Sequence, residues 1–338
     1  MVVVIKEYIM EIKQYAPVII PTLNRFDHFK RCLESLEKCT GAEHTDVYVA
    51  LDYPPSEKYI DGWKKIGAYL VEKEKNNSFA NLCVTRRERN YGVGHENSNG
   101  AVMLREVEQK YDRYIFTEDD NVFSVNFLDY INKGLELYKD DMRILHVCGY
   151  NYQIEFPSSY INNFYFSRQG SPWGYGAWVN RYELINKYYN LETLGKIIKD
   201  KDAVAKLKKE RPSTVRSIIN MLKNKQIYGD SVFGTIVTLE DMYFLMPMIS
   251  KVRNLGTDGS GVHATSIDQE KINYFQKQII DNQSTFEFTN DVFTVKPINV
   301  IEAQMPVNKL KEVYKNFVFQ VDFFLWRHFS FVPKSKYI

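Results

Sequence analysis

The chain has 338 residues, which is long enough for one large α/β domain with additions or for two domains. Hydrophobic residues make up 44% and charged residues 25%, as in ordinary globular proteins, and a net charge of +2 gives no reason to expect nucleic acid as a partner. The apolar N-terminus is broken by Lys6, Glu7 and Glu11, so neither a signal peptide nor a membrane-spanning helix is expected.

The first 150 residues alternate between β-branched apolar runs and segments with apolar residues at helical spacing. The apolar runs predict strands at 17–22, 46–52, 81–87, 113–119 and 143–150. The helically spaced segments predict helices at 26–39, 57–75, 95–111 and 125–139. Such alternation is typical of βαβ units, so we expect an α/β fold with a mostly parallel central sheet flanked by helices.

The pattern changes after residue 150. Residues 167–182 are rich in glycine and aromatic residues and predict a loop that leads into a helix. Residues 196–225 carry ten basic and three acidic residues and predict a solvated helical hairpin broken at Pro212. The four cysteines form no C-x-x-C pair, so we expect them to be reduced, as in a cytoplasmic protein.

Polar residues follow four of the predicted strands: Asn24 and Arg25; Asp52; Arg86 and Arg87; and Glu118, Asp119 and Asp120. Ligands bind outside the carboxyl ends of parallel strands, so these residues mark a candidate site. The glycines of segment 90–100 have the wrong spacing for a dinucleotide fingerprint, and a nicotinamide cofactor is therefore not expected.

The acidic triplet Glu118, Asp119 and Asp120 is the most charged of these strand ends. Neighbouring carboxylates raise one another's pKa, so placing three together is unfavourable unless something compensates. A divalent cation would compensate, and so would solvent around a loop in which Ser124 caps the next helix. The triplet alone leaves both readings open.

Several blocks occur in an order that resembles a known family. PTLNRFDHFKRCLESL resembles the first strand and helix of family 2-type glycosyltransferases, which have the Rossmann-like GT-A fold. RRERNYGVGHENSNGAV, YIFTEDDNVFSVNFLDYINKGLELYKDD and SPWGYGAW resemble successive blocks of a bacterial branch of these enzymes. The EDD motif also resembles that of animal N-acetylglucosaminyltransferase I.

The resemblance implies a GT-A domain at 15–265, with a nucleotide-sugar-binding half at 15–150 and an acceptor and catalytic half at 151–265. A C-terminal helical and aromatic extension would occupy 266–338. The family implies a nucleotide-sugar donor, most often a UDP-sugar, with Mn²⁺ or Mg²⁺. It also implies transfer to a hydroxyl of a glycan or lipid-linked glycan in surface polysaccharide biosynthesis. A single in-line displacement assisted by an Asp base would invert the sugar centre, and the sequence leaves a retaining enzyme open.

By the same resemblance, Asp120 is the metal ligand. His263, which sits where some relatives have a histidine near the diphosphate, is a second candidate for the metal site. Asp230 falls where relatives carry the catalytic base, although Tyr228 and Gly229 replace the Trp that often precedes it. The other residues implied in donor binding are Thr22, Asn24, Arg25, Asp52, Arg87, Asn90, Gly92, Glu118, Asp119, Trp173 and Gly174.

Simpler roles exist for several of these residues. Asp230 can cap a helix, His263 can be a loop histidine, and Asp52 can belong to a turn before Pro54. Trp173 can be a core aromatic. Two other functions also remain: a sugar nucleotidyltransferase, which would need a glycine-rich loop that the first strand lacks, and a non-catalytic nucleotide-sugar or glycan-binding module.

The tail 309–338 carries nine aromatic residues and six basic residues against two acidic ones. Such a segment can lie in a membrane interface and bring a cytoplasmic enzyme to the inner face of the plasma membrane as a peripheral protein. It can equally dock on the domain or form a homodimer interface. The sequence does not decide between these readings.

Overall fold

The computed structural model describes residues 15–152, 154, 156, 160, 162–260, 278–282, 288 and 309–332. Its centre is an eight-stranded sheet. Across the sheet, the strands are β3 (Asn81–Arg86), β2 (Asp46–Leu51), β1 (Val18–Thr22), β4 (Arg113–Phe116), β8 (Tyr175–Trp178), β6 (Ile144–Cys148), β9 (Tyr243–Pro247) and β7 (Phe164–Ser167). All except β8 and β7 run in the same direction, which confirms the mostly parallel α/β sheet.

The N-terminal elements match the expected alternation to within a few residues. Their helices are α1 (Phe26–Glu37), α2 (Ile60–Lys73), α3 (Asn99–Val107) and α4 (Phe127–Leu137). Alternate residues of β1 enter opposite cores, with Val18 and Ile20 on one face of the sheet and Ile19 on the other. One core lies beneath α1, α2 and α4, and the other beneath α3 and the later helices.

The segment 167–182 is not simply a loop before a helix, as expected, because it contains β8. This strand lies between β4 and β6 and is antiparallel to both. Its four residues are buried, so no polar–apolar alternation marks it in the sequence. Gly176 fits there because a Cβ atom would lie 2.5 Å from Ile131 Cγ2. The expected helix follows as α5 (Tyr182–Tyr188).

Three helices, and not a hairpin of two, occupy the basic region: α6 (Leu191–Lys199), α7 (Lys201–Glu210) and α8 (Pro212–Asn224). Asp200 causes the additional break, since its carboxylate accepts hydrogen bonds from the first backbone N–H groups of α7. Pro212 begins α8, a position where its missing N–H costs nothing. Then α9 (Gly229–Leu239) leads into β9.

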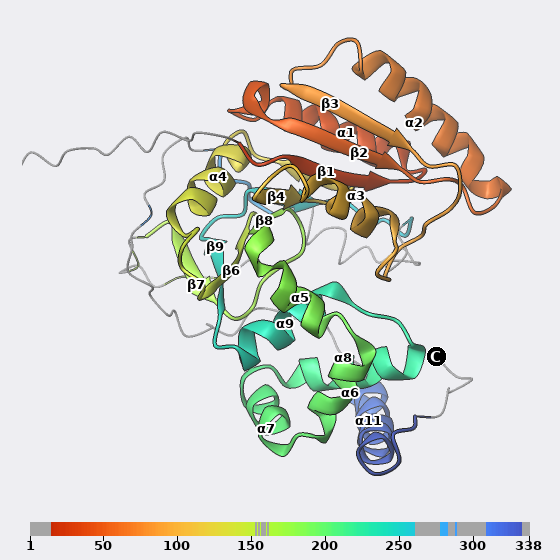
Figure 1. The fold of residues 1–338 in the computed structure, drawn as a ribbon, viewed down its shortest axis with the longest axis vertical. Helices are drawn as coiled ribbons and strands as arrows, with labels where there is room; N and C mark the ends of the chain where they lie inside the picture. Colours follow the sequence, from red (N-terminus) through yellow and green to blue (C-terminus); the bar gives the residue numbers. More distant parts are fainter. Residues whose placement is uncertain are drawn as a thin grey trace, which may run out of the picture.

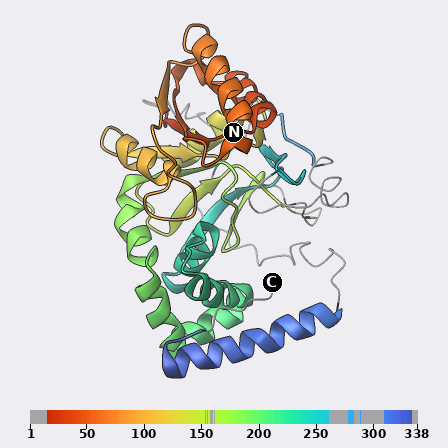
Figure 2. The same ribbon diagram turned by 90° about the vertical axis from the view of Figure 1, so that its right-hand side faces the viewer.

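The tail forms a long helix, α11 (Lys309–Phe329), which contacts α6 and α8. Figures 1 and 2 show β3 and α2 at one end of the molecule and α11 at the opposite end. Short 3₁₀ helices complete the described elements at Ala42–His44, Glu57–Tyr59 and Val179–Arg181. Over the part of the chain described here, no helix combines the length and apolar character needed to cross a membrane. The four cysteines are free.

A small second sheet pairs β5 (Asn121–Phe123) with β10 (Val252–Asn254) in antiparallel register. In this register Asn254 lies opposite Asn121, immediately after the acidic triplet. The pairing therefore brings residues 254–256 to the carboxyl end of β4, although more than a hundred residues separate them in sequence.

A glycine pair tests the packing of β8. Gly176→Ala should lower the free energy of unfolding by about 1–3 kcal/mol, because the added methyl group would overlap Ile131. Gly67→Ala, in α2, meets no atom within 4 Å and should raise that free energy by about 0.5–1 kcal/mol. Chemical denaturation measures both changes, and a Gly176→Ala protein as stable as wild type would contradict the packing of β8.

Candidate active site

The carboxyl ends of β1, β2 and β4 bring the sequence-predicted polar residues to one edge of the sheet. Arg25 lies between the last residue of β1 and the start of α1, and the acidic triplet follows β4. Parallel strands place their carboxyl ends together, which is why residues so far apart in sequence meet here.

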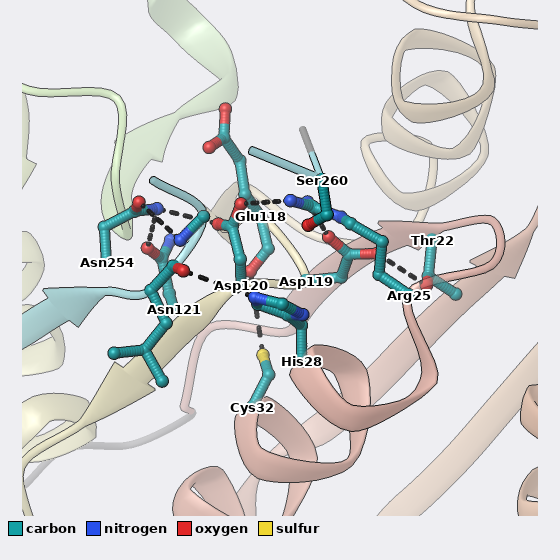
Figure 3. Close-up of polar contacts among 12 residues, drawn as sticks. Thr22, Arg25, His28, Cys32, Glu118, Asp119, Asp120, Asn121, Asn254 and Ser260 are labelled. Carbon is teal, nitrogen blue, oxygen red and sulfur yellow. Dashed lines mark hydrogen bonds and ion pairs between the residues drawn. The ribbon is translucent and has the colours of Figure 1, made fainter. Parts of the chain in front are cut away.

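Arg25 joins two of the three acids in this cluster (Figure 3). Its Nη2 atom donates to Asp119 Oδ1, and its Nη1 atom lies 2.8 Å from Asp120 Oδ2. The hydroxyl of Thr22 donates to Asp119 Oδ2 at 2.8 Å. Burial by itself would lower the pKa of Arg25, but the two carboxylates raise it above its ordinary value. Arg25 therefore stays charged between the two acids.

Asp120 is held from its other side by the turn after β10. Asn254 Nδ2 donates to Asp120 Oδ1 at 2.7 Å, and Leu255 N donates to the Asp120 carbonyl at 2.9 Å. Gly256 is required next, because a Cβ atom there would lie 2.0 Å from Asp120 Oδ2. Both carboxylate oxygens of Asp120 thus have partners within the chain.

Glu118 is the acid of the triplet that forms no ion pair with Arg25. Its side chain points away from the other labelled residues in Figure 3, and no hydrogen bond to it occurs among the described residues. Burial, together with the charges of Asp120 and Asp119 and against the opposing charge of Arg25, raises the pKa of Glu118 to about 8. Burial also raises the pKa of Asp119, against the opposing effect of Arg25.

His28 and Asp258 lie beside this cluster and were not predicted from the sequence. His28 Nε2 lies 3.2 Å from Asp258 Oδ2 and 3.2 Å from the Leu255 carbonyl. Burial would raise the pKa of Asp258, but hydrogen bonds from Ser260 and the charges of His28 and Arg25 lower it below its ordinary value. His28 is on the buried face of α1. The one sequence feature that could have marked it as a site residue is the presence of a histidine among the apolar residues of that face.

Asp52 uses its carboxylate to hold the loop that follows β3. It accepts hydrogen bonds from the backbone N–H groups of Tyr91 and Gly92, each at 2.8 Å, and from Asn90 Nδ2 at 3.1 Å. Gly92 has a φ of 66°, a conformation that favours glycine. The predicted residues Asp52, Asn90 and Gly92 are therefore brought together, with Asp52 positioning the loop.

Arg87 lies against α3 and not against the acidic triplet. Its Nε and Nη1 atoms donate to Asn99 and Glu106, at 3.1 and 3.0 Å. Its Nη2 atom is buried and has no hydrogen-bond partner in the portion of the chain that the structure describes. Asn24 lies at the start of α1, with its carbonyl packed against Gly62 of α2.

Trp173 and Gly174 precede β8 and lie at the same carboxyl edge. Tyr175, the next residue, is paired with Phe116 at the end of β4. The Trp173 ring packs edge-on against Tyr150, with centroids 4.7 Å apart. Gly174 has a φ of 68°, and its carbonyl accepts a hydrogen bond from Gly149 N at 2.7 Å.

Asp230 is in the first turn of α9 and is exposed. Its Oδ1 atom accepts a hydrogen bond from Ser231 N at 2.7 Å. The residue lines a hollow together with Ser171, Pro172 and Arg211. The charge of Asp230 is the smallest of the causes that raise the pKa of Glu118. His263 lies outside the described residues.

Within the described ranges, no three His, Cys, Asp or Glu side chains are arranged to hold a metal ion alone. The donor set still fits a hard cation that shares its ligands with phosphates, because such ions need only one or two protein carboxylates. The carboxylates of Asp119 and Asp120 together carry one more charge than Arg25, and a cation would neutralise it. Asp120 would exchange its contact with Arg25 for the cation.

No protein-family model matches the sequence, and no curated protein does. Solved structures similar to the chain include a 1–349 fragment of S. aureus TarS, with 14% identity over 93% of this chain and 81% of that one, and a TM-score of 0.44. A longer S. aureus TarS structure has 19% identity over 45% of this chain but 25% of its own length, with a TM-score of 0.31.

Another similar structure is the mannosyltransferase PcManGT from Pyrobaculum calidifontis, solved with GDP-Man and Mn²⁺. It has 11% identity over 54% of this chain and 52% of that one, with a TM-score of 0.35. Several of these alignments thus span about half or less of the proteins concerned. At these identities and TM-scores, the likeness says nothing about the activity of this chain.

The raised pKa of Glu118 makes stability depend on pH. Between about pH 4.5 and 8 the folded protein keeps a proton that the unfolded chain has lost, so the stability from neutral Glu118 is lost as pH rises. Glu118→Gln stays neutral, and its free energy of unfolding should exceed that of wild type by about 1–3 kcal/mol at pH 8 and match it near pH 4. Urea denaturation across this range measures the difference, with the exposed Glu88→Gln as control; a variant less stable than wild type at pH 8 would contradict the assignment.

Proposed function

We propose that this chain is a metal-dependent glycosyltransferase that moves a sugar from a nucleotide-sugar donor to a hydroxyl group. The observation that carries the proposal is the acidic triplet at the carboxyl edge, in which Arg25 pairs with the buried carboxylates of Asp119 and Asp120. The motif order described for the sequence supports the same class of enzyme.

In this proposal the donor lies along the carboxyl edge of β1, β2 and β4. Its nucleotide occupies the part shaped by the Asp52-anchored loop, and its diphosphate lies near Arg25. An arginine is suited to phosphate because its planar group offers several donors at once. A UDP-sugar is the donor class that we favour, and Trp173 and Gly174 border the site.

Asp120 would hold a Mn²⁺ or Mg²⁺ ion, which when bound would neutralise charge on the departing diphosphate. Arg25, released from Asp120, stays charged and can donate to a phosphate oxygen. Asp119 keeps Arg25 in place through its own ion pair, and Thr22 orients Asp119. The protein side chains thus arrange positive charge where the leaving group becomes negative.

Asp230 is the proposed general base. An acceptor hydroxyl has a pKa far above 7, so it needs a base as it attacks the sugar carbon. Asp230 is exposed, so an acceptor can approach its carboxylate from solvent. Attack from the side opposite the leaving group inverts the sugar centre, and the acceptor we favour is a glycan or lipid-linked glycan of polysaccharide biosynthesis.

A non-catalytic nucleotide-sugar or glycan-binding module is the second candidate. One observation favours it: both oxygens of Asp120 already have partners within the chain. Such a module would bind the donor but would not depend on Asp230. A sugar nucleotidyltransferase has less support, because the turn after β1 contains no glycine to cradle phosphates.

Asp120→Asn tests the metal site. The substitution keeps the size of the side chain but removes its charge, so the Mn²⁺-dependent part of UDP or UDP-sugar binding should fall at least about tenfold. Titration calorimetry with and without Mn²⁺ measures this effect, and Asp140→Asn, at an exposed site, is the matched control. Unchanged affinity and unchanged metal response in Asp120→Asn would overturn the assignment.

Asp230→Asn tests the base. Turnover should fall by about two to four orders of magnitude while donor affinity stays near that of wild type, because an amide cannot accept the proton. Asp241→Asn is the control, since Asp241 is engaged with Arg168 and Lys206 beyond the other end of α9. Turnover within a few-fold of wild type, measured as nucleotide release with acceptor, would place the base elsewhere.

A further inference from the structure

The helix α11 is fixed to the protein by one face, the docked face, formed by Phe319, Asp322, Phe323 and Trp326. Asp322 is buried and lies 2.7 Å from Lys223 Nζ of α8. Trp326 Nε1 donates to the Gly195 carbonyl of α6 at 3.1 Å, and a Cβ atom at Gly195 would lie 2.7 Å from the indole ring. These contacts set the rotation of α11 about its own axis.

The opposite side of α11 is apolar although it is exposed. Its residues recur at helical spacing, and their exposed fractions are 67% for Val313, 63% for Tyr314, 67% for Phe317, 41% for Val321 and 55% for Phe324. We call these five residues the outer face. Phe329 and Phe331 extend it beyond the helix, with exposed fractions of 67% and 60%. Large apolar patches of this kind mark binding surfaces.

The outer face lies at the edge of the molecule. Figure 2 shows α11 along the end opposite β3 and α2, and no described element covers its outward side. Because the docked face is held by an ion pair and an indole hydrogen bond, α11 cannot bury its outer face by turning over without breaking both. A partner must therefore contact α11 along its length, through the exposed apolar side chains of the outer face.

Cationic side chains lie along the border of the docked face, beside the outer face. Lys199 Nζ lies 2.5 Å from Ser330 Oγ, and Arg216 donates to Asn316. Lys208 and Arg327 lie over the Phe323 ring, at 4.5 and 5.5 Å. Asp322, the acid on the docked face, is neutralised by Lys223. The apolar outer face, with cations along its border toward the docked face, is complementary to a surface that is apolar inside and negative outside.

We propose that the outer face of α11 is a docking surface for an anionic lipid bilayer, in which Phe317 and Phe324 enter the acyl boundary and the bordering cations contact the headgroups. A second copy of the chain fits less well, because pairing two outer faces would bring two sets of cations together without compensation. The proposal does not depend on the donor site.

Vesicle co-sedimentation of the full chain tests the proposal. Phosphatidylcholine vesicles containing phosphatidylglycerol should bind the protein, pure phosphatidylcholine vesicles should bind it more weakly, and added salt should weaken the binding. The double variant Phe317→Glu with Phe324→Glu should lose at least about tenfold in its partition coefficient. Both positions are exposed, so its melting temperature should stay near that of wild type.

The matched control is the double variant Val71→Glu with Met142→Glu. Both residues lie far from α11 and are exposed, by 48% and 51%. This control should bind vesicles like wild type. Equal vesicle binding by the two double variants, or no binding by wild type, would overturn the proposal. In that case, a wild-type dimer that the α11 variant dissociates, seen by sedimentation velocity, would identify a second copy as the occupant. Donor binding measured on the same samples reports separately on the proposed function.

Discussion

The ion pairs of Arg25 with Asp119 and Asp120 are the interaction on which the carboxyl edge depends. Arg25 precedes α1, whereas the two acids follow β4, so the contacts fix these segments relative to each other. Removing one partner from a buried ionic cluster is strongly destabilising, because the remaining charge has no compensation. Thr22 and Asn254 complete the arrangement from opposite sides with neutral donors.

The acids along this edge have two different uses. The Asp52 carboxylate accepts hydrogen bonds from backbone N–H groups of the loop after β3. These bonds fix the loop and stabilise the charge of Asp52. In the triplet after β4, Asp119 and Asp120 have donors for their oxygens, whereas burial and the charges of these two acids raise the pKa of Glu118. Because Asp119 and Asp120 exceed Arg25 in charge, the negative potential is concentrated at the end of the edge that follows β4, and cationic groups are attracted there.

Periodicity predicted the first half of the fold well because α1 to α4 and the early strands have one-sided patterns, as at Phe29 and Leu33 of α1. It missed β8 for two reasons. A strand buried on both faces shows no polar–apolar alternation, and a glycine such as Gly176 is more typical of a loop than of a strand. It also missed Asn254, Gly256 and Asp258, whose roles come from contacts with residues more than a hundred positions away. The stripe of Phe319, Phe323 and Trp326 was visible in sequence, but only the structure separates this docked stripe from the outer one.

The central position of β8 has a consequence for the order in which the protein can fold. β4 pairs with β1 on one side, but its other neighbour is synthesised about sixty residues later, after β6 and β7. A nascent chain that has completed β1 to β4 therefore presents β4 as an open edge, with unpaired backbone groups beside apolar side chains. Non-local closure of this kind slows folding and leaves a partly folded chain prone to association. The open edge of the nascent sheet is therefore closed only when the four residues of β8 pair with β4, and the tendency of the partly folded chain to associate ends at that step.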